Sequence, residues 1–157
     1  MSRWNVVITI ALALAAGSAH ARIIPLPLGE RVAAADAVAV VRVCSTRQNN
    51  REGRFQRVAC AQVIRLIKGE QRPAFEIEFI SDFKCETVVY APGDEAIVFL
   101  RRREGGRWET LQGTYGHFPI QGGACEWESS DDEYWQPAIV PTREAMARLS
   151  ELVQVQR

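Results

Sequence analysis

Four cysteines are the residues of this chain with the most definite chemistry. They are Cys44, Cys60, Cys85 and Cys125. No two of them have the C-x-x-C spacing of a zinc site, so we expect no metal. An even number of cysteines in an exported chain indicates two disulfides, for which three connectivities exist. We prefer Cys44 with Cys60 and Cys85 with Cys125, because the first pair would join adjacent strands of a predicted hairpin.

Nucleophilic or acid–base catalysis would need partners that the sequence does not offer. His117 is the histidine that remains after the predicted leader is removed, and no G-x-S-x-G motif is present. Glu126, Glu128 and residues 131–133 are acidic, but glycoside hydrolysis depends on separation in space rather than in sequence. The same segment lacks the spacing and glycine of a calcium loop. We therefore predict no enzyme and no cofactor, with a small hydrolase as the least favoured alternative.

Arginines crowd two predicted hairpins and could bind an anionic ligand. The set comprises Arg47, Arg51, Arg54, Arg57, Arg101, Arg102 and Arg103, with Arg107 close by. Few aromatic residues interleave with them, so the stacking platform of single-strand nucleic-acid binders is not predicted. Without the leader the chain has 18 basic and 19 acidic residues, a net charge of −1 that gives no general attraction to nucleic acid or anionic membranes. An acidic protein, a glycan or lipopolysaccharide is the expected kind of anion.

The first 21 residues have the layout of a secretory signal peptide. Arg3 precedes the apolar run Val6–Ala16, and small residues follow up to Ala21. The run is much shorter than the roughly 20 residues of a membrane-spanning helix. We expect cleavage after Ala21, no membrane anchor, and a single domain over residues 22–157 in the periplasm or outside the cell.

The expected fold is mainly β. Strict alternation in Phe75–Ile80 places Phe75, Ile77 and Phe79 on a buried face and the glutamates between them in water. The other predicted strands cover residues 37–44, 55–67, 95–100, 108–111 and 116–120, after a short helix over 29–35. Thr142 is the predicted N-cap of an amphipathic C-terminal helix, in the segment 142–153. Residues 122–136 are expected to form an irregular polar surface. Five or six strands with regular turns predict a sandwich or a closed barrel.

Several short sequence segments occur in the same order as in a known protein family. They are Ala35–Val43, Val63–Glu70, Phe75–Ile80, Cys85 and Pro92–Leu100. Together they resemble the netrin-like domain of tissue inhibitors of metalloproteinases and their small exported bacterial relatives. The resemblance covers about residues 35–120 and implies a five-stranded OB-like barrel flanked by helices.

The inhibitory mechanism of that family does not carry over to this chain. In the family, the mature chain begins with a cysteine that grips the zinc of the protease, whereas the mature chain predicted here begins at Arg22 and its first cysteine is Cys44. We therefore expect an exported, non-catalytic binding or interaction module of the cell envelope. Its expected partner is another envelope or extracellular protein. The alternative is a protease inhibitor that acts through a surface other than the N-terminus.

Overall fold

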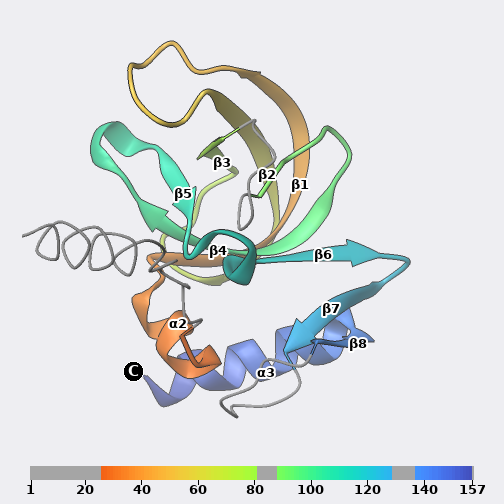
Figure 1. The fold of residues 1–157 in the computed structure, drawn as a ribbon. Helices are drawn as coiled ribbons and strands as arrows, with labels where there is room; N and C mark the ends of the chain where they lie inside the picture. The colour runs from red at the N-terminus through yellow and green to blue at the C-terminus, as the bar shows by residue number, and fades with distance from the viewer. Residues whose placement is uncertain (1–25, 81–87, 129–136, 157) are drawn as a thin grey trace, which may run out of the picture.

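Five strands form a closed barrel in the computed structural model of the chain, which describes residues 26–80, 88–128 and 137–156. The strands are β1 (Ala37–Gln48), β2 (Arg57–Lys68), β3 (Ala74–Phe79), β4 (Glu95–Arg102) and β5 (Trp108–Thr110). Their order is β1-β2-β3-β5-β4, and pairing of β1 with β4 closes the ring (Figure 1). β3 and β5 are parallel, and the other barrel pairs are antiparallel. The predicted OB-like barrel is confirmed.

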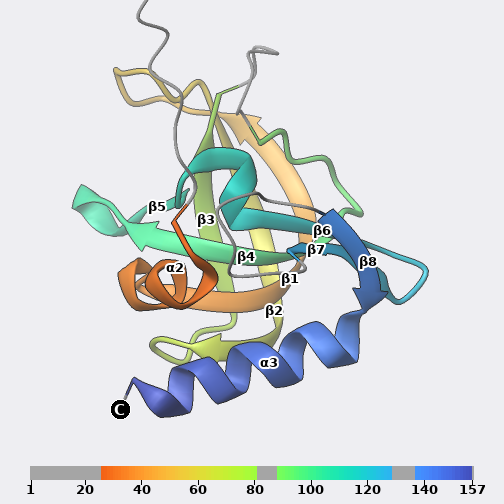
Figure 2. The ribbon, with the colours of Figure 1, turned by 60° about the horizontal axis from the view of Figure 1, so that its bottom comes forward.

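Three further strands and two helices complete the described fold. The strands are β6 (His117–Gln121), β7 (Ala124–Glu128) and β8 (Pro137–Pro141), and the helices are α2 (Leu28–Ala34) and α3 (Thr142–Val155). Two short 3₁₀ turns, η1 (Glu104–Gly106) and η2 (Gly113–Gly116), flank β5. Both predicted helices are present, and Figure 2 shows them on the same side of the barrel.

The segment after β6 differs from the sequence prediction. Residues 124–128 form a regular strand rather than an irregular surface, while residues 129–136 lie outside the described part of the chain. Gly122 and Gly123 make a two-residue turn with φ values of 59° and 80° between the paired residues Gln121 and Ala124. Two adjacent positive-φ residues suit the tight turn of a hairpin. The Gly-Gly pair was therefore the signal for this hairpin.

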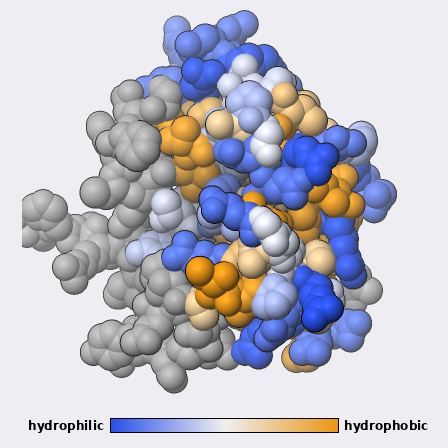
Figure 3. All heavy atoms as spheres, turned by 90° about the vertical axis from the view of Figure 1, so that its right-hand side faces the viewer, coloured by the Kyte–Doolittle hydropathy of each residue, from blue (hydrophilic) through white to orange (hydrophobic). Residues whose placement is uncertain are grey.

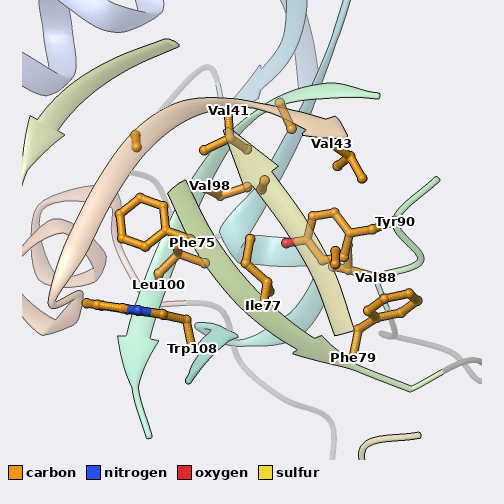
Figure 4. Close-up of a cluster of buried hydrophobic side chains, with 14 of the residues drawn as sticks. Val41, Val43, Phe75, Ile77, Phe79, Val88, Tyr90, Val98, Leu100 and Trp108 are labelled. Carbon is orange, nitrogen blue, oxygen red and sulfur yellow. The ribbon is translucent and has the colours of Figure 1, made fainter. Parts of the chain in front are cut away.

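The interior of the barrel combines small and large side chains. Ala37, Ala39, Ala59, Ala61 and Ala96 are fully or almost fully buried there. They leave room for the aromatic rings shown in Figure 4. Phe75 meets Trp108 edge to face at 5.0 Å between centroids, and Phe79 meets Tyr90 in the same way at 5.5 Å. Such alternation of size is how a narrow barrel is filled without a cavity.

A second core lies between the outer wall of the barrel and the two helices. Val38 and Val40 of β1 face this core, so residues 37–41 of β1 are buried on both sides and form a continuous apolar run. α3 contributes Ala145, Leu149 and Val153, which recur every four residues along one face.

The start of α3 differs slightly from the prediction. Pro141 occupies the N-cap position without a side-chain cap, and Thr142 is the first helical residue. The backbone N–H of Thr142 donates to the carbonyl of Gly123 at 2.9 Å. The β6–β7 turn thus satisfies one of the first N–H groups of α3, which have no partner within the helix. Over the described residues, no helix combines the length and apolar character needed to cross a bilayer.

Arg31 anchors α2 in the second core. Its side chain is fully buried, and it donates to the carbonyls of Leu26 at 2.6 Å and Tyr115 at 2.9 Å. The guanidinium lies 6.0 Å from the ring centroids of both Phe99 and Phe118. A buried charge needs such hydrogen bonds, so Arg31 ties the start of the domain to the η2 turn.

Replacing Leu149 with alanine tests whether α3 is an integral part of the domain. Leu149 is fully buried, so Leu149→Ala should lower the free energy of unfolding by about 2–5 kcal/mol. The exposed Glu151→Ala on the same helix should change it by less than about 0.5 kcal/mol. Urea denaturation measures both. Equal effects of the two substitutions would mean that the helix is not docked on the barrel.

Candidate ligand-binding face

The outer surface of β3 and β5 carries a row of carboxylates. Because Ile77 and Trp108 point into the barrel, their neighbours Glu78 and Glu109 point outward, and these two form a register pair between the parallel strands. Glu78 and Glu109 are nevertheless only 6% and 5% exposed. The expectation that the glutamates of β3 stand in water is therefore wrong for Glu78. The loops after β1 and β4 cover it.

Three arginines converge on Glu109. Arg101 Nε donates to Glu109 Oε1 at 3.0 Å, while Arg103 Nη1 and Arg54 Nη2 lie 2.8 and 3.3 Å from Oε2. Burial of this carboxyl acts to raise its pKa. The hydrogen bonds and charges of Arg101 and Arg103 outweigh that effect and hold the pKa of Glu109 below its ordinary value. Glu109 is thus ionised and fixed within a cationic setting.

Glu78 and the aromatic ring of Phe55 tie the two loops to the barrel. Arg103 Nε lies 3.1 Å from Glu78 Oε2, and Asn49 Nδ2 donates to Oε1 at 3.1 Å. The guanidinium carbons of Arg54 and Arg103 lie 4.7 and 4.5 Å from the centroid of the Phe55 ring. Contacts of this kind restrain long arginine side chains that would otherwise move freely. The arginines are therefore held in place by carboxylates and by one aromatic ring.

A third carboxylate extends the row along β3. Glu76 Oε1 accepts a hydrogen bond from Arg47 Nη2 at 2.6 Å, and its Oε2 lies 3.0 Å from Arg107 Nε. We call the whole surface the arginine face. It consists of Arg47, Arg54, Arg101, Arg103, Arg107, Glu76, Glu78, Glu109 and Phe55.

The structure divides the arginines that the sequence grouped together. Four of the seven predicted residues, Arg47, Arg54, Arg101 and Arg103, belong to the arginine face. Arg51 instead reaches the carbonyls of Glu104 and Gly105 at 3.4 and 3.5 Å, and so joins the β1–β2 loop to the β4–β5 loop.

The side chains of Arg57 and Arg102 leave their strands on the side opposite to the arginine face. Arg57 pairs in register with the interior residue Phe79 and donates to Thr46 Oγ1 at 2.8 Å. Arg102 pairs with the interior residue Trp108, so its exposed side chain leaves β4 on the side opposite to Arg101. The predicted patch is thus not one continuous surface.

A hollow of about 260 Å³ opens in the arginine face. Its lining includes Arg54, Phe55, Glu78, Arg101, Glu109 and Gln112. Gln112 has a φ of 56°, a left-handed conformation that no other non-glycine residue of the described chain adopts. Such strain is uncommon outside turns and functional sites. The sequence reasoning missed the carboxylates Glu78 and Glu109, although the alternation of β3 already placed Glu78 on the outer surface.

The apolar surface lies elsewhere. A groove of about 410 Å³ is lined by Val40, Ile64, Ile120 and Met146, between the barrel wall and α3. On the side toward which the β6–β7 hairpin points, apolar residues form separate patches among hydrophilic ones (Figure 3). The arginine face is therefore distinct from these apolar regions in its chemistry.

Two of the cysteines lie close together on the outer surface of the β1–β2 hairpin. The register shifts between Val43 and Ser45, so that Cys44 is the extra residue of a bulge beside Cys60. Cys44 is exposed, and its Sγ lies 3.9 Å from Gln62 Oε1.

None of the described cysteines forms a disulfide in this structure. Cys44, Cys60 and Cys125 are free thiols, and Cys85 lies outside the described residues. Cys125 is buried in the second core, and burial raises the pKa of its thiol.

His117 begins β6 with its Nε2 enclosed by the protein. Its ring meets that of Tyr90 edge to face at 5.2 Å between centroids. Desolvation lowers the pKa of His117 to about 4, and the charge of Asp94 only partly opposes this. The imidazole is therefore neutral at physiological pH and packs as part of the fold.

Comparison with known proteins assigns no chemistry to this chain. No protein-family model, curated protein or solved structure matches it. Within residues 26–80, 88–128 and 137–156, no group of three or more His, Cys, Asp and Glu side chains is placed to hold a metal ion. The site must therefore be interpreted from its own geometry.

The pKa of His117 predicts that acid weakens the fold. In the unfolded chain this histidine takes up a proton near pH 6.5, but in the native state it does so only near pH 4. Its contribution to stability is therefore complete above pH 6.5 and is lost as the pH falls toward 4, by up to about 3 kcal/mol. Urea denaturation at pH 7 and pH 4.5 should show a smaller acid loss for His117→Gln than for the wild type. An identical loss in both proteins would contradict the prediction.

Proposed function

We propose that this chain is an exported, non-catalytic binding module that holds an anionic partner on its arginine face. The barrel topology supports this proposal, because OB barrels bind their ligands where the β1–β2 and β4–β5 loops meet beside β2 and β3. Here Arg51 bridges those two loops, and Arg54 and Arg103 belong to them. The face thus occupies the part of the barrel that suits ligand binding.

The observation that carries the proposal is the charge balance of the arginine face. Its five arginines, Arg47, Arg54, Arg101, Arg103 and Arg107, stand against three carboxylates, Glu76, Glu78 and Glu109. The side chains of Arg54 and Arg101 are 68% and 56% exposed, so part of this charge faces water. A local excess of exposed cations attracts an anionic partner and speeds its association.

Export is the second part of the proposal. It is supported by the leader-like sequence up to Ala21 and by the two thiols of the β1–β2 hairpin. An oxidising compartment would convert Cys44 and Cys60 to a disulfide, and the bulge already brings them to neighbouring positions. The partner expected from the sequence is an envelope or extracellular protein. We also propose that the chain is a member of the netrin-like group and that Cys85 and Cys125 form a second disulfide.

Two matched double variants test the arginine face. Arg47→Ala with Arg54→Ala removes two exposed arginines. The Arg47–Glu76 pair is exposed on both sides and contributes less than about 1 kcal/mol to stability, and Arg101 and Arg103 still pair with Glu109 when Arg54 is removed. Arg65→Ala with Arg102→Ala makes the same change of charge outside the face. Envelope extract is passed over each immobilised protein, and the retained molecules are identified and quantified. A partner held by the wild type and by the control pair, but at least tenfold depleted on the first pair, is the expected result.

The retained partner should also be released by salt, with a weaker salt dependence in the first pair than in the wild type. Equal retention by both double variants would contradict binding at this face.

Peptide mapping without reduction tests export and the hairpin disulfide together. Protein recovered from the cell envelope should yield a linked pair of tryptic peptides containing Cys44 and Cys60, because trypsin cleaves at the arginines between them. The same digest should contain an N-terminal peptide that begins at Arg22. Closing this loop would stabilise the fold by about 3 kcal/mol. A Cys44–Cys125 link, or a chain that still carries Trp4, would be the contrary result.

A further inference from the structure

The arginines of the hollow are held in position before any ligand arrives. From this we propose that the hollow binds a tetrahedral oxyanion group, a phosphate or sulfate ester, and that Glu109 is a positioning residue for the arginines that grip it. This inference rests on the proposed function and names the ligand class of the same face.

The first argument is that the arginines of the hollow keep N–H donors that Glu109 does not use. Both oxygens of Glu109 are already occupied, Oε1 by Arg101 and Oε2 by Arg54 and Arg103. A guanidinium carries five N–H donors. Arg54 directs one of its two Nη atoms to Glu109, and Arg101 uses one edge of its guanidinium. The guanidinium N–H groups of Arg54 and Arg101 that do not contact Glu109 are therefore available donors, and they match a ligand that brings several acceptor oxygens.

The second argument is the local charge. Arg54 and Arg101 balance Glu78 and Glu109 in the lining of the hollow. Arg103, which pairs with both carboxylates, adds one positive charge beside it. The two carboxylates line the hollow but are tied up by arginines and by Asn49. A compact anion can thus approach the outer edges of Arg54 and Arg101, while the carboxylates fix the inner edges.

The third argument is the strained turn at the rim. Gln112 and Gly113 both line the hollow, with φ values of 56° and 58°. Gln112 Oε1 accepts a hydrogen bond from the Leu26 N–H at 3.1 Å, which holds this turn in place. Turns that contain left-handed residues can direct backbone N–H groups toward an anion. Strain of this kind persists where the surroundings and a function maintain it.

The size of the hollow favours a small anionic group over an extended protein surface. The hollow of about 260 Å³ suits a phosphate or sulfate ester with part of the group that carries it. The buried centre of a protein–protein interface is generally more apolar than its rim. The large exposed apolar residues of the described chain are Ile64, Val89, Ile139 and Val155. None of them belongs to the arginine face.

Calorimetric titration of the mature protein tests the ligand class. The probes are inorganic phosphate, inorganic sulfate and acetate, each at the same ionic strength in chloride buffer. Phosphate or sulfate should bind at least tenfold more tightly than acetate. Poly-L-glutamate that binds as tightly as either tetrahedral anion, on a per-site basis, would overturn the proposal in favour of an acidic protein. Binding that does not distinguish the three anions would overturn it as well.

Two further probes distinguish the source of the group. Glucose 6-phosphate represents a phosphorylated sugar, and phosphatidylcholine vesicles containing phosphatidic acid represent a lipid headgroup. At least one of them should compete with inorganic phosphate, and the tighter one identifies the carrier. Failure of both to compete would overturn the ester as the natural ligand.

Glu109→Gln tests the positioning role. This variant makes the face more positive, so a purely electrostatic site would bind phosphate more tightly. If Glu109 positions the arginines, phosphate affinity should instead fall at least fivefold and the preference over acetate should shrink. Glu109→Asp should recover part of that preference. Arg102→Ala, a matched control outside the face, should change neither quantity.

Phe55→Leu provides a second test in case Glu109→Gln does not fold. It keeps every charge but removes the ring on which Arg54 and Arg103 lie. Phosphate affinity should again fall, and unchanged affinity in a folded variant would overturn the proposal that the arginines are held in advance. The proposed function is tested separately. It fails if the Arg47/Arg54 double variant and its control retain equal amounts of the envelope partner.

Discussion

The short parallel pairing of β3 with β5 is the contact on which the rest of the molecule depends. Two register pairs join the strands there, Ile77 with Trp108 and Glu78 with Glu109. The first pair fills the interior and the second lies outside. Like charges on neighbouring strands disfavour pairing. The arginines around Glu78 and Glu109 offset that repulsion, so the ion pairs of the arginine face support the pairing of β3 with β5.

This coupling explains why the loops of the face are ordered. Arg103 contacts both carboxylates, and Arg54 reaches Glu109 from the β1–β2 loop. Phe55 lies under both guanidinium groups. Loops are usually more mobile than the elements that they connect, but these two are anchored to a buried carboxylate pair. The arginine face is therefore anchored to the barrel wall.

The sequence predicts the barrel much better than it predicts the face. The alternation of Phe75, Ile77 and Phe79 is local, and it places β3 correctly. The burial of Glu78 is not local, because it depends on Asn49 and on Arg103, far away in the chain. Period-two alternation separates Arg101 from Arg102, yet which of them faces Glu109 follows only from the register with β5. Pairing between distant segments thus determines which side chains lie on the arginine face, and composition alone does not predict that pairing.

The added sheet β6-β7-β8 gives this otherwise closed molecule an open border. β8 is the last strand in the order of the described sheet, and Ile139 in its centre is 82% exposed. An exposed strand of this kind is a template for aggregation. β8 begins with Pro137 and ends with Pro141, and proline has no N–H to donate to a neighbouring strand. The two prolines thus limit strand-to-strand association at this exposed edge of the sheet.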